Sequence, residues 1–419
     1  MEIKKICELI DERKNELFEL LLSLIRINSE SYGEFGNEKE IAEYIKGVCE
    51  SLGMEAEAYS PLDIEGMREH PDYMDGRNLE NRFNVTAKWR GKDDVDELML
   101  MGHLDTVEAG DRQNWSFDPF EGIMRDGRIY GRGACDDKYA LATALFIIKI
   151  LRDEGFVPKK NLIFSGYCDE EHGGSHGALA AVLKSKANRI VNMDGRFEHL
   201  WNCASGGGEG KFIFRMNKTV DSAKYVAAAI PTVLSVMEEE FGRKRREELK
   251  ANSFYDGTKI PETSLRYMGI RAGKDGTDLG VGEIYITYYT DKTKDEIFGE
   301  FDAIRDILNE KLKELDITVD KFLPTTRFFH YAHCDKDDAH VAEFVKIANE
   351  AIGEAPLVCG SCLSDLSIIS KYGTSHAFAY GCGRDFSLEG GAHQPDEFIE
   401  CDKLVKFAKI IAAYVVSVL

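Results

Sequence analysis

Two hydrophobic patterns alternate along the chain. Segments with apolar residues three and four positions apart predict amphipathic helices, at residues 3–27, 38–52, 139–152, 339–352, 366–371 and 402–419. Short apolar runs predict strands at residues 83–89, 97–104, 161–168, 189–194 and 375–381. This alternation is typical of an α/β domain with a mainly parallel sheet and helices on both faces.

The middle of the chain has a different pattern. A glycine-rich stretch, which we expect to be a hinge, occupies residues 204–210. After it, the order β-α-β-β-α extends to a helix at residues 294–315. This order predicts a smaller, ferredoxin-like α+β domain at residues 208–322, inserted into a larger domain formed by residues 1–207 and 323–419.

Several predicted strands end in side chains of the metal-ligand type. These side chains are His103 and Asp105, then Asp169, Glu170 and Glu171, and finally Asp194. In open α/β sheets, sites form beyond the carboxyl ends of the strands, so adjacent strands would bring these groups together. Buried carboxylates in such a group require cations or protons. The sequence therefore predicts a metal site at this edge of the sheet.

Other segments extend this candidate site. Asp136 and Asp137, in "YGRGACDDK", precede a predicted helix, whose N-terminus favours one carboxylate. The second carboxylate is explained if it bridges two metal ions. His393 lies before the last helix, in "GGAHQPDEFI". Asp105 is spaced from His103 so that it can orient the imidazole of His103, as metal-binding histidines commonly require.

The motifs "GHLDTV", "YGRGACDDK", "DEEHGG", "NMDG" and "GGAHQPDE" resemble a known family in their order and spacing. It is the dinuclear zinc aminoacylase/carboxypeptidase family, which includes acetylornithine deacetylase, succinyl-diaminopimelate desuccinylase and several di- and tripeptidases. The resemblance covers residues 1–203 and roughly 327–419.

This resemblance implies a role for each site residue. It implies two zinc ions per chain, at sites that cobalt or manganese could also occupy. One zinc would be held by His103, Asp136 and Asp194, and the other by Asp136, Glu171 and His393, so that Asp136 bridges them. Glu170 would be the general base, Asp105 would support His103, and the Asp136–Asp137 peptide would be cis.

The inserted domain departs from the family pattern. In the family it is a lid with a Gly-x-x-Ala-His-Ala segment, whose histidine stabilises the oxyanion. Here this segment is missing, and no histidine occurs between His199 and His330. His330 and His333 are the first replacement candidates, followed by His199, Arg266, Arg271 and Arg384. Gly383 and Arg384, in "GCGRD", resemble a substrate-binding loop of the family.

The implied reaction is hydrolysis of an amide bond in an N-acyl amino acid or a small peptide, by a water molecule activated between two zinc ions. The implied assembly is a homodimer formed through the lid. An alternative is a relative that binds metals and ligand without turnover. A serine hydrolase that uses Ser175, in the G-x-S-x-G pattern "GGSHG", is a further alternative.

Composition limits the other functions. The net charge of −21 argues against binding to nucleic acids or anionic membranes through a basic surface. No apolar run reaches the roughly 20 residues that cross a bilayer, and the N-terminus is amphipathic rather than a signal peptide, so we expect a cytoplasmic protein. The ten cysteines are scattered, and only "CGSC" (359–362) has the spacing of a redox pair.

Overall fold

The chain forms two compact units in this computed structural model, which describes residues 1–216, 221–275, 279–335 and 337–419. The first unit contains Met1–Asn202, His333–Val358 and Ile368–Leu419, and the second contains Cys203–Ala332 and Cys359–Ser367. The second unit thus includes the residues predicted for the inserted domain, 208–322, and extends beyond them at both ends. It also takes in residues 359–367, where the Ser361 carbonyl accepts a hydrogen bond from the Ser205 hydroxyl at 2.9 Å.

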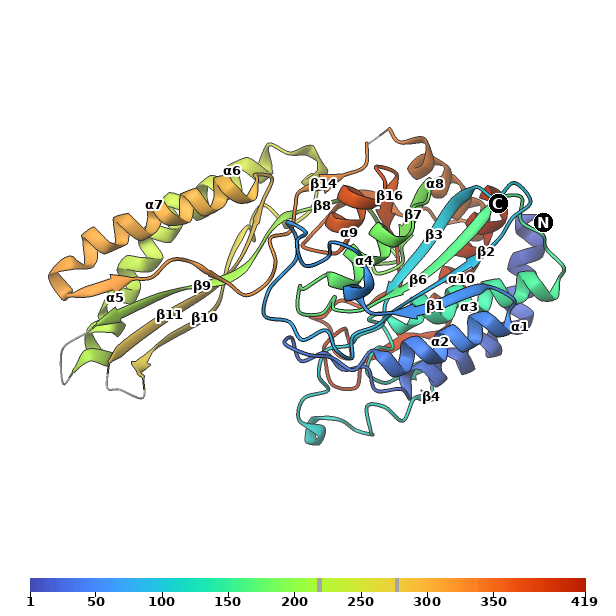
Figure 1. The fold of residues 1–419 in the computed structure, drawn as a ribbon, viewed down its shortest axis with the longest axis horizontal. Helices are drawn as coiled ribbons and strands as arrows, with labels where there is room; N and C mark the ends of the chain where they lie inside the picture. The colour runs from blue at the N-terminus through green and yellow to red at the C-terminus, as the bar shows by residue number, and fades with distance from the viewer. Residues whose placement is uncertain (217–220, 276–278, 336) are drawn as a thin grey trace. The chain divides into compact units, whose positions relative to one another are not determined.

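A mixed sheet forms the centre of the first unit (Figure 1). Among the described residues it has nine strands, with β15 (Leu357–Ser361) paired to β8 off the main path. The main order is β1 (Glu55–Tyr59), β2 (Asn84–Trp89), β6 (Asn161–Tyr167), β3 (Asp96–His103), β7 (Arg189–Asn192), β16 (Ala377–Ala379), β8 (His199–Ala204) and β14 (Ala332–His333). The central strands β6, β3, β7 and β16 run parallel, while β1, β2 and β8 pair antiparallel with their neighbours.

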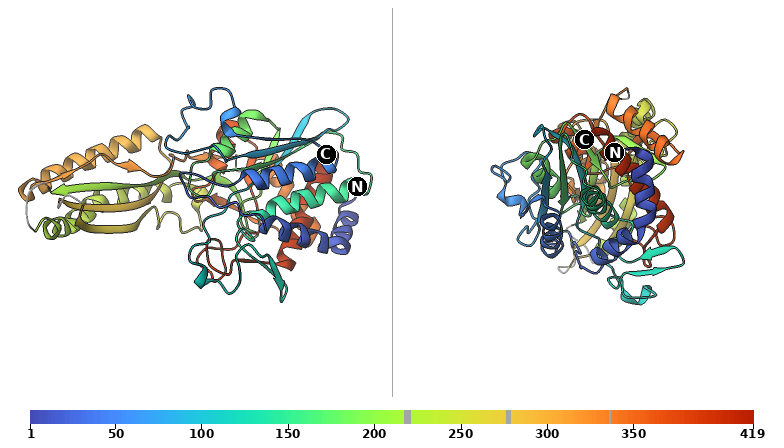
Figure 2. Two further views of the ribbon diagram at one scale, coloured as in Figure 1. Left: turned by 60° about the horizontal axis from the view of Figure 1, so that its bottom comes forward. Right: turned by 90° about the vertical axis from the view of Figure 1, so that its right-hand side faces the viewer.

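Helices cover both faces of this sheet (Figure 2). On one face, Leu98 and Leu100 of β3 share an apolar core with α1 (Ile3–Ile25), α2 (Lys39–Ser51), α3 (Lys138–Asp153), α8 (Ala339–Ile352) and α10 (Cys401–Val418). Alternate residues of a strand point to opposite faces, so Met99 and its neighbour Ile190 face the other side. There Gly373 lies between Ile190 and Val182, which belongs to α4 (His176–Lys184).

The predicted helices and strands of this unit are present with boundaries shifted by a few residues. The helix predicted at residues 366–371 corresponds to α9 (Leu366–Ile368) and η6 (Ile369–Gly373). The sequence patterns did not indicate α4, β1, β8, β14, β15, the short helices η1 (Pro61–Asp63) and η2 (Arg112–Asn114), or a small sheet of β4 (Ile123–Arg125), β5 (Arg128–Tyr130) and β17 (Phe398–Glu400). α4 was missed because the glycines of "HGGSHG", which precede it and enter its first turn, are poor helix formers.

The second unit has its own sheet and its own apolar core. The sheet order is β10 (Leu265–Lys274), β11 (Gly280–Thr290), β9 (Gly206–Met216) and β12 (Ile317–Val319), with β13 (Leu323–Pro324) also paired to β9. Helices α5 (Ser222–Met237) and α7 (Lys294–Leu312) pack on this sheet, with Val226, Val233 and Phe301 buried against Phe212 and Phe214. The remaining elements are η3 (Glu238–Gly242), α6 (Arg243–Lys250), η4 (Ser253–Tyr255) and η5 (Lys313–Leu315).

The prediction of a hinge at residues 204–210 is wrong. Strand β9 begins at Gly206, and its glycines pair antiparallel with β11, with Gly206 opposite Thr290 and Gly210 opposite Ile286. A Cβ atom on Gly210 would lie 2.4 Å from the ring of Phe322. The glycines therefore allow close packing within the second unit, a role that composition alone does not distinguish from flexibility.

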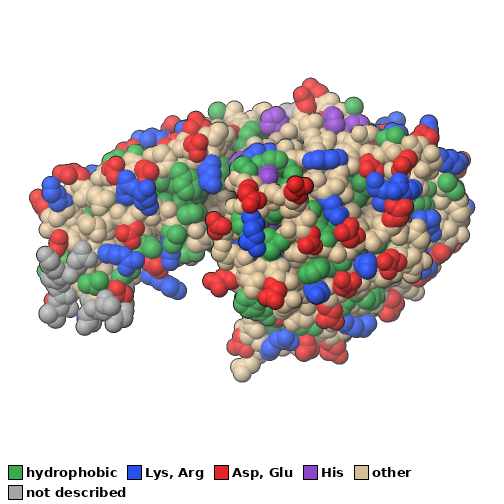
Figure 3. Space-filling view, viewed as in Figure 1, with side chains coloured by type: hydrophobic (Ala, Val, Ile, Leu, Met, Phe, Trp, Pro, Cys, Tyr) green, Lys and Arg blue, Asp and Glu red, His purple; other side chains and the backbone are tan. Residues whose placement is uncertain are grey.

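Surface and membrane features limit the environment of the protein. Within the described residues, no helix is long and apolar enough to cross a membrane. Red carboxylates and blue cations are interspersed on the face drawn in Figure 3. All ten cysteines are free thiols, including Cys359 and Cys362 of the "CGSC" segment. The segment therefore does not form a disulfide in this structure.

Two helix glycines give a matched stability test. A Cβ on Gly177 of α4 would lie 2.2 Å from the Cys168 carbonyl oxygen, whereas Gly47 of α2 has no atom within 4 Å. We expect Gly177→Ala to lower the free energy of unfolding by about 1–3 kcal/mol through overpacking. Gly47→Ala should raise it by about 0.5–1 kcal/mol, because alanine favours the helix. Urea unfolding followed by circular dichroism measures both, and equal effects would contradict the packing of α4.

Candidate metal centre

The carboxyl ends of three neighbouring parallel strands lie at one edge of the large sheet. β3 lies between β6 and β7, and its register pairs His103 with Tyr167 and Met101 with Asn192. Glu170 and Glu171 follow β6, and Asp194 follows β7. The sheet order therefore places the predicted ligands at neighbouring strand ends, as the sequence analysis expected.

Asp136 lies between two imidazoles. Its Oδ1 is 2.9 Å from Nε2 of His103, and its Oδ2 is 3.2 Å from Nε2 of His393. Nε2 of His393 is also 2.8 Å from Oε2 of Glu171. His103, Asp136 and Glu171 each offer a ligand atom, and these atoms lie within 4.8 Å of one another. One carboxylate thus presents one oxygen to each imidazole, which is the arrangement of a bridging ligand.

The electrostatics of the cluster favour positive charge. Burial opposes protonation of His103, but the hydrogen bond and charge of Asp136 outweigh it and raise the pKa of His103 well above its usual range. The negative charge of Glu171 is the main cause that raises the pKa of His393 to about 11. Burial of the imidazole opposes this rise, and hydrogen bonds to Asp136 and Glu171 add to it. The carboxylates therefore require protons on the imidazoles, or metal cations, between them.

Asp194 lies in a turn that the first helix after Asp136 holds in place. The Tyr139 hydroxyl of α3 donates to the Met193 carbonyl at 2.8 Å, and the Gly383 N–H donates to the Gly195 carbonyl at 2.9 Å. The charge of Asp194, after the larger effect of burial, helps to raise the pKa of Asp137. Asp194 follows β7, the strand that neighbours β3 and its terminal His103.

Asp105 acts on the glutamates rather than on the imidazole. Its carboxylate accepts the N–H groups of Glu170 at 3.0 Å and of Glu171 at 3.1 Å. The hydrogen-bond partner of His103 Nδ1 is the Asp105 backbone carbonyl at 2.9 Å, whereas the Asp105 carboxylate is 3.8 Å away. This corrects the predicted pairing, because the two backbone donors at the end of β6 turn the carboxylate toward themselves.

Asp137 supports His103 from the other side. Its buried carboxylate accepts the His103 N–H at 3.2 Å. The peptide between Asp136 and Asp137 is cis, as the family resemblance implied. Glu170 is partly exposed, and its charge contributes to the raised pKa of His103, so its carboxylate lies near the cluster.

Two buried arginines that the sequence analysis missed, Arg82 and Arg132, form ion pairs in the loops around the site. Arg82, fully buried, donates to Glu38 at 2.6 Å and contacts Asp169, the first acid of "DEE". Glu397 accepts from Arg132 at 2.6 Å and from the Cys135 N–H at 2.9 Å, next to Asp136. Glu397 belongs to the quoted motif "GGAHQPDE", but neither arginine stands in a pattern that indicates a distant partner.

The other predicted residues lie outside this cluster. Gly383 packs against the carbonyls of Gly195 and Cys135, where a Cβ would be 2.8 and 3.0 Å from the oxygens. Arg384 stacks on Phe398 and lies 3.4 Å from Glu400. His330 belongs to the second unit, and His333 is exposed at the end of β14.

The histidine beside Ser175 in the serine-hydrolase pattern, His176, is engaged by other partners. Ser175 is buried and caps α4, eight residues after the end of β6 at Tyr167. The adjacent His176 uses Nδ1 toward Asp169, and its Nε2 is 3.1 Å from the Met74 carbonyl. Both imidazole nitrogens are therefore engaged away from the Ser175 hydroxyl.

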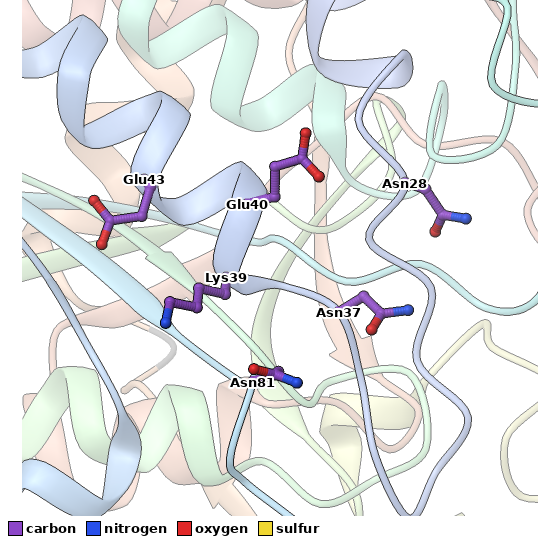
Figure 4. Close-up of a pocket in the computed structure, with 6 residues that line it drawn as sticks. All are labelled: Asn28, Asn37, Lys39, Glu40, Glu43 and Asn81. Atoms are coloured by element: carbon purple, nitrogen blue, oxygen red, sulfur yellow. The ribbon is translucent and has the colours of Figure 1, made fainter.

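A polar groove of about 570 Å³ lies elsewhere on the first unit (Figure 4). Its lining consists of Asn28, Asn37, Lys39, Glu40, Glu43 and Asn81. None of these residues is a predicted ligand or catalytic group. The groove therefore does not belong to the candidate metal centre.

The chain is similar to known metallohydrolases. Residues 99–417 match peptidase family M20/M25/M40. An uncharacterized metallohydrolase of Methanocaldococcus jannaschii is 25% identical over 94% of this chain and 97% of its own length. The N-formyl-4-amino-5-aminomethyl-2-methylpyrimidine deformylase of Bacillus subtilis is 22% identical over 99% of this chain and 97% of its own.

A solved structure supports the same fold. The dipeptidase Dug1p from Saccharomyces cerevisiae superposes with a TM-score of 0.71 at 16% identity, over 99% of this chain and 98% of the other. At this identity the likeness concerns the fold. The family match covers most of the chain and includes the strand ends and loops of the cluster. The chain therefore belongs to peptidase family M20/M25/M40, a family of metallohydrolases that act on carbon–nitrogen bonds.

Proposed function

We propose that this protein hydrolyses the amide bond of an N-acyl amino acid or a small peptide with two zinc ions. The observation that carries the proposal is Asp136, which offers one oxygen to His103 and the other to His393. Two neutral imidazoles and carboxylates form a donor set suited to zinc, with cobalt and manganese as substitutes. The set fits two ions if His103, Asp136 and Asp194 hold one and Asp136, Glu171 and His393 hold the other.

Bound divalent ions would lower the pKa of water and polarise the scissile carbonyl. Glu170 is not a proposed ligand, and its carboxylate would accept a proton from the attacking water and pass it to the leaving amine nitrogen. Asp105 fixes the backbone of both glutamates, so that the base and the ligand keep their separation. The Asp105 carbonyl contacts Nδ1 of His103 and leaves Nε2 toward Asp136, while the Asp137 carboxylate accepts the backbone N–H of His103.

Two other functions are less well supported. A metal-retaining binding protein would not need Glu170, yet the N–H of this unliganded acid is anchored by Asp105 beside the cluster. The serine hydrolase would need a base for Ser175, and His176 is engaged by Asp169 and Met74. The deformylase and dipeptidase among the similar proteins both cleave carbon–nitrogen bonds, which agrees with the proposed reaction but leaves both substrate types open.

The proposal gives the second unit the role of a lid with a dimer surface, and it takes the oxyanion donor from His330 of this unit or from His333, where the first unit resumes. The apolar residues of α5, including Val226 and Val233, are covered by the unit's own sheet, so this helix does not offer the apolar face to a partner. Strand β10 is an edge strand, and it exposes Tyr267, Met268 and Ile270. An exposed apolar edge strand is a template for pairing with another chain, and we propose a second copy as its partner.

The two glutamates after β6 should respond differently to substitution. Glu170→Gln should keep the metal content and lower kcat by at least about 10²-fold, the usual scale for loss of a general base. Glu171→Gln should lower the metal content instead, because Glu171 faces His393. Elemental analysis and kinetics on the best substrate from a panel of N-acyl amino acids and dipeptides measure both. The reverse pattern would show that the roles are exchanged.

His330 and His333 are the first oxyanion donors to test. Loss of such a donor costs about 3–4 kcal/mol of barrier, so replacement by alanine should lower kcat/KM by about 10²–10³-fold for the residue that serves. The matched control is His70→Ala, since His70 lies outside the metal cluster and is not one of the candidate donors. If both variants lose less than about 10-fold, the donor lies elsewhere and this part of the proposal fails.

Dimerisation through β10 is open to a direct test. The full chain should sediment as a dimer, and the double variant Met268→Asp, Ile270→Asp should sediment as a monomer, since charge on an edge strand opposes pairing. Val157→Asp, at an exposed apolar residue of the first unit, is the control and should remain dimeric. A monomeric wild type, or a double variant that stays dimeric, would exclude this surface.

A further inference from the structure

A second group of metal-ligand side chains lies in the first unit, apart from the proposed catalytic cluster. Cys334, Asp338 and His376 each offer one ligand atom, and these atoms lie within 4.8 Å of one another. The thiol of Cys334 and the carboxylate of Asp338 are buried, and the imidazole of His376 is 42% exposed. Solvent therefore reaches the group through His376 alone among the three.

Each of the three residues is fixed by a different part of the fold. The Cys334 N–H donates to the Asn202 carbonyl at 2.7 Å. Asp338 caps helix α8 by accepting the N–H groups of His340 and Val341 through Oδ1, which leaves Oδ2 directed at Nδ1 of His376, 2.6 Å away. His376 leads into β16, and its N–H donates to Thr374 Oγ1 at 3.3 Å. The three ligand atoms therefore come from the residue after β14, the N-terminus of α8 and the residue before β16.

The group is separate from the proposed catalytic site. His376 precedes β16 and lies beside the start of β7, because Ala377 pairs with Ile190. Asp194 lies beyond the opposite end of β7. The four residues of β7, roughly 13 Å of strand, separate His376 at one end from Asp194 at the other. The two groups therefore occupy opposite edges of the same sheet.

We propose that Cys334, Asp338 and His376 form a second zinc site of the first unit, with water as the fourth ligand. Cysteine, histidine and aspartate are all zinc ligands, and a thiolate selects against magnesium and calcium. Tetrahedral zinc places its ligand atoms roughly 3.3–3.8 Å apart, so the 2.6 Å between Asp338 Oδ2 and His376 Nδ1 would widen as the ion enters, within the 4.8 Å span of the group. The ion would take the place of the Cys334 thiol proton and neutralise the resulting thiolate together with the carboxylate of Asp338.

Binding exchanges protons for the ion without any oxidant. The Cys334 thiol releases its proton to solvent, and the imidazole proton of His376 moves from Nδ1 to Nε2. The thiolate sulfur, the Nδ1 lone pair and the Asp338 Oδ2 then face the ion. His340, whose ring centroid lies 4.7 Å from that of His376, packs edge-on against the ligand and restricts its rotation. The bound ion would connect Cys334, after β14, to Asp338 at the start of α8 and to His376 before β16.

Cobalt substitution distinguishes this site from the catalytic one. The proposed catalytic ligands are nitrogen and oxygen atoms, so a thiolate-to-cobalt charge-transfer band can arise only where a cysteine binds. Titrating the metal-free full chain with Co²⁺ should produce this band, and Zn²⁺ should abolish it. Cys334→Ser should lose the band and bind one fewer Co²⁺ per chain. Cys362→Ser removes an exposed thiol as the matched control, and it should keep both.

A second variant tests the imidazole ligand separately from the thiol. His376→Gln retains the thiol but removes the imidazole, so it should weaken Co²⁺ binding at this site at least about 10-fold, a usual scale for perturbing a metal site. Circular dichroism confirms that each variant is folded; if Cys334→Ser is unfolded, His376→Gln alone carries the test. No thiolate band in the wild type, a band that survives Cys334→Ser, or unchanged affinity in His376→Gln would overturn the site. Because the readout is spectroscopic, it does not depend on catalytic activity.

Discussion

The burial of several carboxylates at one edge of the large sheet is the constraint on which the site depends. Asp105, Asp137 and Asp169 are fully buried, and Asp136 and Glu171 lie beside them. Carboxylates this close cannot all remain charged in a low dielectric unless hydrogen-bond donors and cations compensate them. Arg82, the backbone N–H groups and the two imidazoles supply part of this compensation. Divalent cations would supply the rest.

The order of the strands brings the buried carboxylates and the groups that neutralise them to one edge of the sheet. Because β3 lies between β6 and β7, and all three run parallel, their carboxyl ends bring His103, Glu170 and Asp194 to neighbouring positions. Loops that lack regular structure then add Asp136 and His393, and buried contacts hold these loops in place. Glu397 holds the backbone before Asp136, and Tyr139 holds the turn around Asp194. The apolar core fixes the strands, and the buried polar groups fix the ligands.

The sequence indicated this edge because three apolar runs each ended in the same kind of residue. It could not indicate Arg82 or Arg132, since their partners are distant in sequence and an isolated arginine carries no periodic signal. It misjudged the glycines at residues 206–210, because close packing and flexibility use the same residue. It assigned Asp105 to His103 by spacing, whereas the nearer backbone donors of Glu170 and Glu171 determine where the carboxylate points.

The central claim is that two metal ions lie at this sheet edge and share Asp136. Crystals of the zinc-loaded protein, measured by anomalous diffraction on both sides of the zinc absorption edge, test it most directly. The account predicts two peaks about 3.5–4 Å apart, the spacing of dinuclear sites. One should lie among His103, Asp136 and Asp194, and the other among Asp136, Glu171 and His393. A single peak at this edge, or two peaks without Asp136 between them, would contradict it.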